Sequence, residues 1–305
     1  MKYVSRLRFC NRLMQVCLKW SSCSRRDPTL VGGSGCGFYL PSRRFSDESA
    51  SACRDLSGKT ALVTGSTSGI GLGVAETLAE RGCDVIVNGL GDRHQIQAIQ
   101  DNINRKHGVR CHFVDADLSL ESEVTRMCNE VAREFPNGVD VLVNNAGLQH
   151  VCPVEDFPVE KWNLLVAVML SAPFHLIRSF LPGMKTKGWG RIINVASVHG
   201  LVASPQKSAY CAAKHGVVGL TKAVGLETIT AEICVVVAQG QIRTVSERDN
   251  VSFPDAKLRL LETFQPTKEF VDVSQIADLI HFLCTRSADQ ITGSAFTIDG
   301  GWTAR

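Results

Sequence analysis

The chain has 305 residues, of which 44% are hydrophobic and 21% are charged, and its formal net charge is +3. This composition excludes a disordered, collagen-like or coiled-coil chain as a whole, because the apolar fraction is high and no short repeat runs through it. The sequence contains no uninterrupted apolar run of about 20 residues, so we expect no membrane span.

The positive charge is concentrated in residues 1–45, which hold nine of the 33 basic residues and one of the 30 acidic residues. The other 24 basic and 29 acidic residues give the rest of the chain a net charge of −5. Nucleic acid is therefore not an expected partner.

Residues 1–45 resemble a mitochondrial transit peptide, because they are rich in Arg and Ser and nearly free of acids. The run Arg43-Arg44-Phe45-Ser46 resembles a matrix-processing site with cleavage after Phe45. A disordered basic tail is the alternative, and a secretory signal fits less well because no clean apolar stretch follows the first charges. We expect a protein of the mitochondrial matrix.

From residue 58 onward, apolar runs alternate with amphipathic segments. Residues 60–64 predict a buried strand, and Ile70, Val74 and Leu78 recur on one face of the helix that follows it. The same alternation then predicts helices at 93–106, 121–134 and 208–227, and strands at 84–87, 111–114, 139–143, 191–196 and 233–238. Repeated strand–helix units imply one doubly wound α/β domain at 58–305, after a short linker at 46–57.

Twelve cysteines are present, and seven of them lie scattered after residue 58 without a Cys-x-x-Cys pair. This spacing is typical of neither a zinc site nor a redox dithiol. We expect buried free thiols and no bound metal.

A glycine-rich turn, Thr64-Gly65-Ser66-Thr67-Ser68-Gly69-Ile70-Gly71, connects the first predicted strand to the first helix. Glycines allow a sharp turn and let a phosphate approach the N–H groups at the helix N-terminus. This position favours a Rossmann-type dinucleotide site over a purely structural turn. A P-loop does not fit, because no Gly-Lys-Ser/Thr closes the turn.

Ser197, Tyr210 and Lys214 form the second candidate site. Tyr and Lys four residues apart lie on one face of a helix. We expect the lysine ammonium to lower the pKa of the phenol, so that the phenol can act as a general acid or base on an alcohol or carbonyl. The alternative is a core tyrosine beside a solvated lysine, but Tyr210 is the only tyrosine after residue 58.

These motifs, with Asp117 and Asn144-Asn145-Ala146-Gly147, resemble those of the short-chain dehydrogenases in order and spacing. The resemblance implies that Tyr210 exchanges the proton, that Lys214 holds the nicotinamide ribose, and that Ser197 orients the carbonyl. It also implies a nucleotide site formed by Tyr210, Lys214 and a set from the strand ends: Gly65, Thr67, Ser68, Gly69, Ile70, Gly71, Asp117, Leu118, Asn144, Ala146 and Gly147.

Within that family the chain resembles the bacterial (R)-3-hydroxybutyrate dehydrogenases, as in the segments 147–151, 197–202, 206–210 and 299–305. The resemblance implies a small carboxylate substrate, a homotetramer, and a substrate site formed by Ser197, Tyr210, Gln149, His199, Lys207, Gln241 and Trp302. A lysine ammonium together with neutral hydrogen-bond donors favours the binding of a carboxylate. Each polar residue alone could instead be a core or solvated side chain.

The cofactor prediction depends on the segment Asn88-Gly89-Leu90-Gly91-Asp92, which follows the second strand. A ribose 2′-phosphate calls for Arg or Lys at this place, and none occurs before Arg93. Together with the resemblance, this predicts NAD.

Two departures from the family pattern bear on turnover. Met169 stands where the family has a catalytic Asn, and a thioether lacks the donors and acceptors of an amide. The segment 233–241 lacks the family's Pro-Gly loop. A cofactor-binding variant with little or no activity is therefore one alternative. A 3-oxoacyl thioester reductase is another, against which Lys207 and His199 argue.

Overall fold

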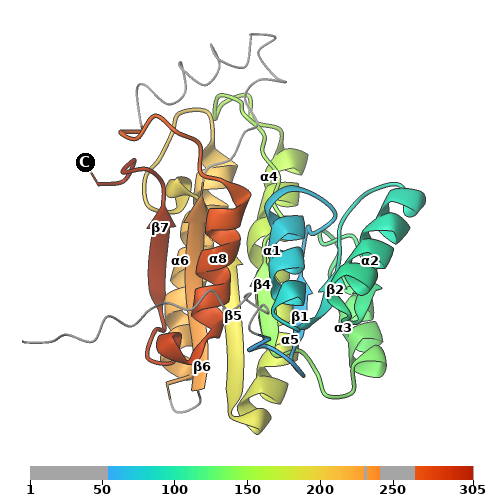
Figure 1. The fold of residues 1–305 in the computed structure, drawn as a ribbon. Helices are drawn as coiled ribbons and strands as arrows, with labels where there is room; N and C mark the ends of the chain where they lie inside the picture. Colours follow the sequence, from blue (N-terminus) through green and yellow to red (C-terminus); the bar gives the residue numbers. More distant parts are fainter. Residues whose placement is uncertain (1–53, 230–231, 241–264, 305) are drawn as a thin grey trace, which may run out of the picture. The chain divides into compact units, whose positions relative to one another are not determined.

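Seven parallel strands form one sheet at the centre of the described chain, which comprises residues 54–229, 232–240 and 265–304 of this computed structural model (Figure 1). The strand order is β3-β2-β1-β4-β5-β6-β7. Since the order reverses between β1 and β4, the carboxyl ends of these two strands flank the point where such sheets bind ligands. The strands are β1 Thr60–Val63, β2 Asp84–Val87, β3 Cys111–Phe113, β4 Val141–Asn144, β5 Trp189–Val195, β6 Glu232–Gly240 and β7 Ser294–Ile298.

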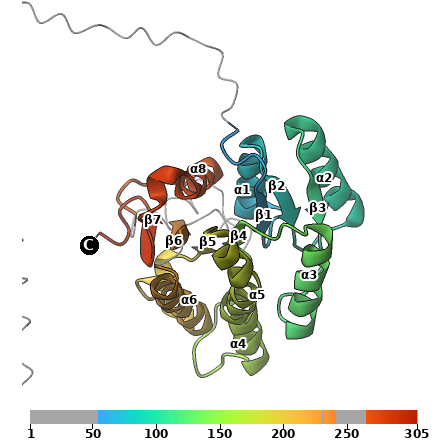
Figure 2. The ribbon, with the colours of Figure 1, turned by 90° about the horizontal axis from the view of Figure 1, so that it is seen from below.

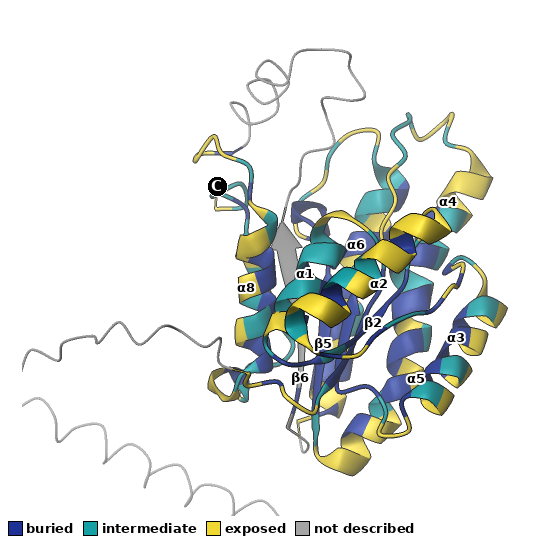
Figure 3. Ribbon diagram, turned by 45° about the vertical axis from the view of Figure 1, so that its right-hand side comes forward, coloured by how far each residue is buried: buried dark blue, intermediate teal, exposed yellow. Residues whose placement is uncertain are grey.

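Helices cover both faces of the sheet (Figure 2). Side chains alternate along each strand, so that Ala61 and Val63 enter one core while Leu62 enters the other. Figure 3 shows that the helices bury the sides that face the sheet. One face carries α1 Gly69–Glu80, α2 Arg93–His107 and α8 Val273–Cys284, and the other carries α3 Glu121–Glu134, α4 Val159–Val166, α5 Ala172–Lys187 and α6 Ser208–Glu227.

Local sequence signals explain where several helices begin and end. The Asp92 carboxylate accepts hydrogen bonds from two backbone N–H groups at the start of α2, and Gly108 ends that helix with φ +62°. At α8, Asp272 and Gln275 form a reciprocal capping box. These caps determine where α2 begins and ends and where α8 begins.

The predicted doubly wound α/β fold is confirmed, and each predicted helix and strand has its counterpart in the sheet or on its faces. The run 233–238 lies within β6, which pairs with both β5 and β7, so the sheet survives the short segment after α6. The helical segment 159–187, α8 and β7 were not predicted from the sequence. The proposed presequence at 1–45 and residues 46–53 of the proposed linker lie outside the described residues.

Within the described part of the chain, one continuous helical stretch, Val159–Lys187, is long and apolar enough to cross a membrane by length and composition. Buried core helices pass the same test. Leu165, Leu176 and Met184 from this stretch pack in the core beneath the sheet, so its apolar character is explained by the fold.

Candidate active site

The glycine-rich turn leaves the end of β1 and opens α1 next to the switch point. Gly65 and Gly69 have φ values of +62° and +56°, which favour glycine. A Cβ atom at Gly71 would lie 2.2 Å from the Gly65 carbonyl oxygen, so only glycine fits there. By contrast, the space beside Gly69 is open, with no atom within 4 Å of an added Cβ. The turn therefore presents an open helix N-terminus, which suits a pyrophosphate.

Asn145, the first residue after the neighbouring strand β4, fixes this turn. Its side-chain amide donates to the carbonyl oxygens of Thr64 at 2.9 Å and Gly65 at 3.1 Å. In return, the Thr64 hydroxyl accepts the backbone N–H groups of Asn145 and Ala146. This role of Asn145 could not be predicted, because the sequence does not show in which direction an amide side chain points.

Asn144, the other amide of the pair, is buried beneath the site. Its Nδ2 atom donates to Asn194 Oδ1 at 2.8 Å, and Asn194 donates in turn to Thr221 on α6. This chain of polar contacts ties β4 and β5 to the helix that carries Tyr210. The predicted support of the nucleotide by Asn144 stays a prediction.

The predicted adenine-side residues follow β3. Asp117 is exposed, and its Oδ1 atom accepts both the N–H and the hydroxyl of Ser119. Leu118 is buried and packs in the core. Asp117 therefore faces outward in a fixed turn. Its Oδ2 atom accepts no hydrogen bond from the described residues.

Ser197, Tyr210 and Lys214 are brought together at the carboxyl end of β5. The Tyr210 phenol is hydrogen-bonded to the Ser197 hydroxyl. Lys214 Nζ lies 5.8 Å from the Tyr210 ring centroid and donates to the Val195 carbonyl oxygen at 2.8 Å. Burial lowers the pKa of Lys214 to about 8. The predicted catalytic group thus forms one cluster at the sheet edge that faces the glycine-rich turn.

The prediction that Lys214 lowers the pKa of the Tyr210 phenol is wrong. Burial raises the pKa of Tyr210, and the hydrogen bond from Ser197 offsets only part of that rise. The Lys214 ammonium is directed to the Val195 carbonyl instead of the phenol oxygen. At neutral pH the phenol therefore carries its proton.

Three of the predicted substrate residues form a second cluster beside Tyr210. The Lys207 ammonium donates to His199 Nε2 at 3.1 Å, which places the ring proton on Nδ1. The His199 ring meets the Tyr210 and Trp302 rings edge-on, with centroids 6.0 and 6.3 Å away. Burial and the Lys207 charge lower the pKa of His199 to about 4, so the imidazole is neutral at neutral pH.

Two other predicted substrate residues are not placed in this cluster. Gln149 is exposed in the loop after β4, and its side chain has no hydrogen bond to any residue that the structure describes. Gln241 lies outside the described residues.

The turn of helix that contains Met169 is a π-helix, Ala167–Ser171, between α4 and α5. Met169 is buried, and a Cβ added to Gly147 would lie 3.7 Å from its Sδ atom and 3.9 Å from Lys214 Nζ. Gly147 therefore leaves a space that the thioether and the ammonium flank. A π-turn often marks a functional position in a helix, and hydrophobic periodicity gave no sign of it.

No cluster of three or more metal-ligating side chains occurs among residues 54–229, 232–240 and 265–304. The six cysteines whose side chains are described there are free thiols.

Three features of the site suit a dinucleotide: the open N-terminus of α1, the exposed Asp117 carboxylate beyond β3, and the space at Gly147 beside Lys214.

This fold and this Tyr–Lys cluster define a dinucleotide-dependent oxidoreductase. The chain belongs to the short chain dehydrogenase family, whose model matches residues 59–253. It is 46% identical over 260 residues to a D-beta-hydroxybutyrate dehydrogenase of Cupriavidus necator, covering 82% of this chain and 100% of that protein. A Rhizobium meliloti protein of the same name is 45% identical over 258 residues, covering 81% and 99%.

Solved structures agree with this assignment. L-sorbose reductase from Gluconobacter frateurii, in complex with NADPH and L-sorbose, superposes with a TM-score of 0.78 at 27% identity, covering 83% of this chain and 99% of that chain. A nicotinamide dinucleotide is therefore the cofactor class of this fold.

Proposed function

We propose that the chain interconverts (R)-3-hydroxybutyrate and acetoacetate with NAD(H). The observation that carries this proposal is the position of Lys207 and His199, joined at 3.1 Å, directly beside the Ser197–Tyr210 pair. If Lys207 and His199 hold the carboxylate of 3-hydroxybutyrate, the hydroxyl of the same molecule reaches Ser197 and Tyr210. The two relatives named for this substrate support the same assignment.

The roles of the side chains follow from their contacts. A nicotinamide dinucleotide, when bound, would supply the acceptor for the hydride of the alcohol carbon in oxidation and its donor to the ketone in reduction. Tyr210 takes the hydroxyl proton during oxidation and gives it back during reduction. Ser197, which is already hydrogen-bonded to the phenol, holds the substrate oxygen. The hydrogen bond to the Val195 carbonyl oxygen holds the Lys214 ammonium next to the Tyr210 ring.

Lys207 is proposed to read the substrate carboxylate, so we expect Lys207→Met to raise the KM for (R)-3-hydroxybutyrate about 10- to 100-fold. The reason is the loss of a charge-assisted hydrogen bond, while the neutral His199 remains. Steady-state kinetics measure this effect, with Lys222→Met on the exposed side of α6 as the charge-matched control. Equal activity of wild type and Lys207→Met toward low concentrations of the acid would contradict the role.

Met169 is the feature that favours the alternative of a weakly active variant. We expect Met169→Asn to raise kcat about tenfold, because an amide beside Lys214 supplies donors and acceptors for proton transfer. Met169→Leu is the apolar control and should leave kcat unchanged. The measurement is kcat per NADH-binding site, which corrects for loss of folded protein. An unchanged kcat in Met169→Asn would show that this proton path does not limit turnover.

NAD is the proposed cofactor rather than NADP. The Asn88 amide donates to the Val114 and Ala116 carbonyl oxygens, and the Asp92 carboxylate caps α2. Residues 88–92 thus offer no cation to a 2′-phosphate. For (R)-3-hydroxybutyrate and neutral alcohols we expect a higher kcat/KM with NAD than with NADP, and for 3-oxoacyl thioesters, which are reduced, a higher kcat/KM with NADH than with NADPH. Preference for the thioesters would favour the reductase alternative.

We also propose that the protein is a homotetramer of the mitochondrial matrix. The charge asymmetry of residues 1–45 supports the location, and the resemblance to the family supports the assembly. Fusing residues 1–45 to a fluorescent reporter should direct it to mitochondria, and a cytosolic reporter would refute the location. Light scattering of the purified chain measures the assembly, and a monomeric mass would contradict it.

A further inference from the structure

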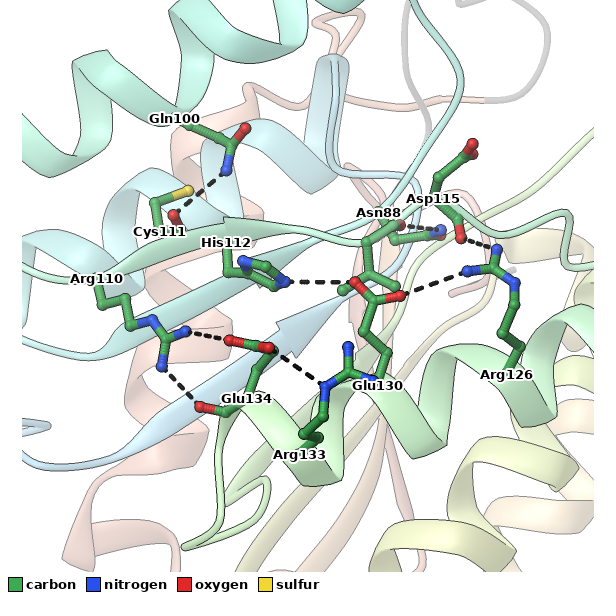
Figure 4. A network of polar contacts seen from close by, with 11 residues as sticks. Asn88, Gln100, Arg110, Cys111, His112, Asp115, Arg126, Glu130, Arg133 and Glu134 are labelled. Atoms are coloured by element: carbon green, nitrogen blue, oxygen red, sulfur yellow. Dashed lines mark hydrogen bonds and ion pairs between the residues drawn. The ribbon is translucent and has the colours of Figure 1, made fainter.

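The segment that follows β3, residues 114–118, is held by side chains at three successive carbonyl groups. Asn88 Nδ2 donates to the carbonyl oxygens of Val114 at 3.1 Å and Ala116 at 3.3 Å. The Arg126 guanidinium, from α3, donates to the carbonyl oxygen of Asp115 between them (Figure 4). Amide and guanidinium therefore clamp the segment through its backbone.

Arg126 is itself oriented by two carboxylates on its own helix. Its Nη2 atom lies 2.6 Å from Glu123 Oε2, and its Nη1 atom lies 3.4 Å from Glu130 Oε2. The other oxygen of Glu130 lies 3.5 Å from His112 Nε2 on β3 (Figure 4). The planar guanidinium can satisfy both carboxylates and still donate to the carbonyl, which a lysine ammonium does less well.

The strand order shows which part of a dinucleotide reaches this segment. Tyr210 lies beyond β5, and the glycine-rich turn follows β1. A dinucleotide with its nicotinamide at Tyr210 and its pyrophosphate at the turn extends over the carboxyl ends of β2 and β3. Its adenosine half then meets residues 114–118, where Asp117 faces outward.

Hydrogen bonds also connect residues 114–118, through Asn88, to the glycine-rich turn. The Asn88 backbone N–H donates to the Ser66 hydroxyl oxygen at 3.1 Å, and the Asn88 carbonyl oxygen accepts the Ser66 N–H at 2.7 Å. Ser66, Asn88 and the clamped segment thus form one hydrogen-bonded unit across the ends of three strands.

We propose that Arg126 is a positioning residue that holds residues 114–118 in the shape that binds the adenosine half of the cofactor. This inference rests on the proposed function, because it needs the dinucleotide to lie across the strand ends as described. Arg126 acts only through the Asp115 carbonyl and touches no reacting atom. It therefore sets cofactor affinity and not the rate of the chemical step.

The test compares Arg126→Gln with Arg133→Gln, which removes another arginine of α3 that contacts Glu134 at the surface. We expect Arg126→Gln to raise the Kd for ADP-ribose and the KM for NAD about three- to tenfold. The kcat and the KM for (R)-3-hydroxybutyrate should stay unchanged. Arg126→Lys should restore part of the affinity, and Arg133→Gln should match wild type.

Calorimetry with ADP-ribose and nicotinamide mononucleotide separates the two halves of the cofactor. A loss confined to ADP-ribose supports the proposal, whereas equal ADP-ribose affinity in wild type and Arg126→Gln overturns it. An equal loss for both ligands, together with a lower Tm, would show a merely structural role and also overturn it. A wild-type chain that binds no NADH would instead refute the proposed function, and this inference with it.

Discussion

Tyr210→Phe is expected to lower kcat about 10²- to 10⁴-fold, because it removes the general acid–base and keeps the rest of the side chain. The ring that meets His199 edge-on is retained, and so is the buried Lys214 contact with Val195. NADH affinity should therefore stay within a factor of about two, since no binding contact of comparable strength is lost. Turnover rates and NADH fluorescence titrations on the same preparation measure both quantities.

The pH profile adds a second readout for the same residue. Oxidation needs the deprotonated phenol, and burial raises the pKa of Tyr210, so kcat/KM for oxidation should increase with pH through the alkaline range. Reduction needs the protonated phenol, so its kcat/KM should be flat near neutral pH and fall at alkaline pH. A Tyr210→Phe variant that keeps wild-type turnover, or an oxidation rate that falls as pH rises, would contradict this role.

Gly71→Ala is expected to weaken NADH binding at least about tenfold, which corresponds to the cost of overpacking a tight backbone contact. The added Cβ atom would lie 2.2 Å from the Gly65 carbonyl oxygen and 2.5 Å from Asn145 Nδ2. These two atoms form the hydrogen bond by which Asn145 holds the glycine-rich turn. Relief of the overlap must therefore move the turn itself.

Gly183→Ala is the matched control for this steric prediction. Gly183 lies on the exposed side of α5 and has no atom within 4 Å of an added Cβ. Alanine there should be neutral or should stabilise the chain by about 0.4–1 kcal/mol. Fluorescence titration with NADH and thermal melting distinguish the two variants. Equal NADH affinity in Gly71→Ala and wild type would show that the turn tolerates a side chain and does not bind the pyrophosphate.

Much of the fold could be predicted because the first βα units repeat a clear pattern. The helices 121–134 and 208–227 have the predicted bounds, since each carries a continuous apolar face and polar ends. The stretch 159–187 was missed because its long apolar run contains Pro173 and Pro182, which obscure the helical period. The π-turn at Met169 packs against α6, where Leu170 meets Gly216, and no local signal marks it.

The site was predictable where spacing determines geometry, as for Tyr210 and Lys214 one turn apart on α6. Side-chain direction was not predictable: Asn88 turns inward to the strand ends, and Asn145 braces the turn. The pKa of Tyr210 was predicted in the wrong direction because sequence spacing places a cation nearby but does not show how deeply the phenol is buried.

The most direct test of the whole account is the rate of NADH formation by the purified chain from each enantiomer of 3-hydroxybutyrate, beside the Tyr210→Phe variant. We expect turnover with NAD and the (R)-acid, no turnover with the (S)-acid, and loss of turnover in the variant. A chain that binds NADH but converts the (R)-acid no faster than Tyr210→Phe would contradict it.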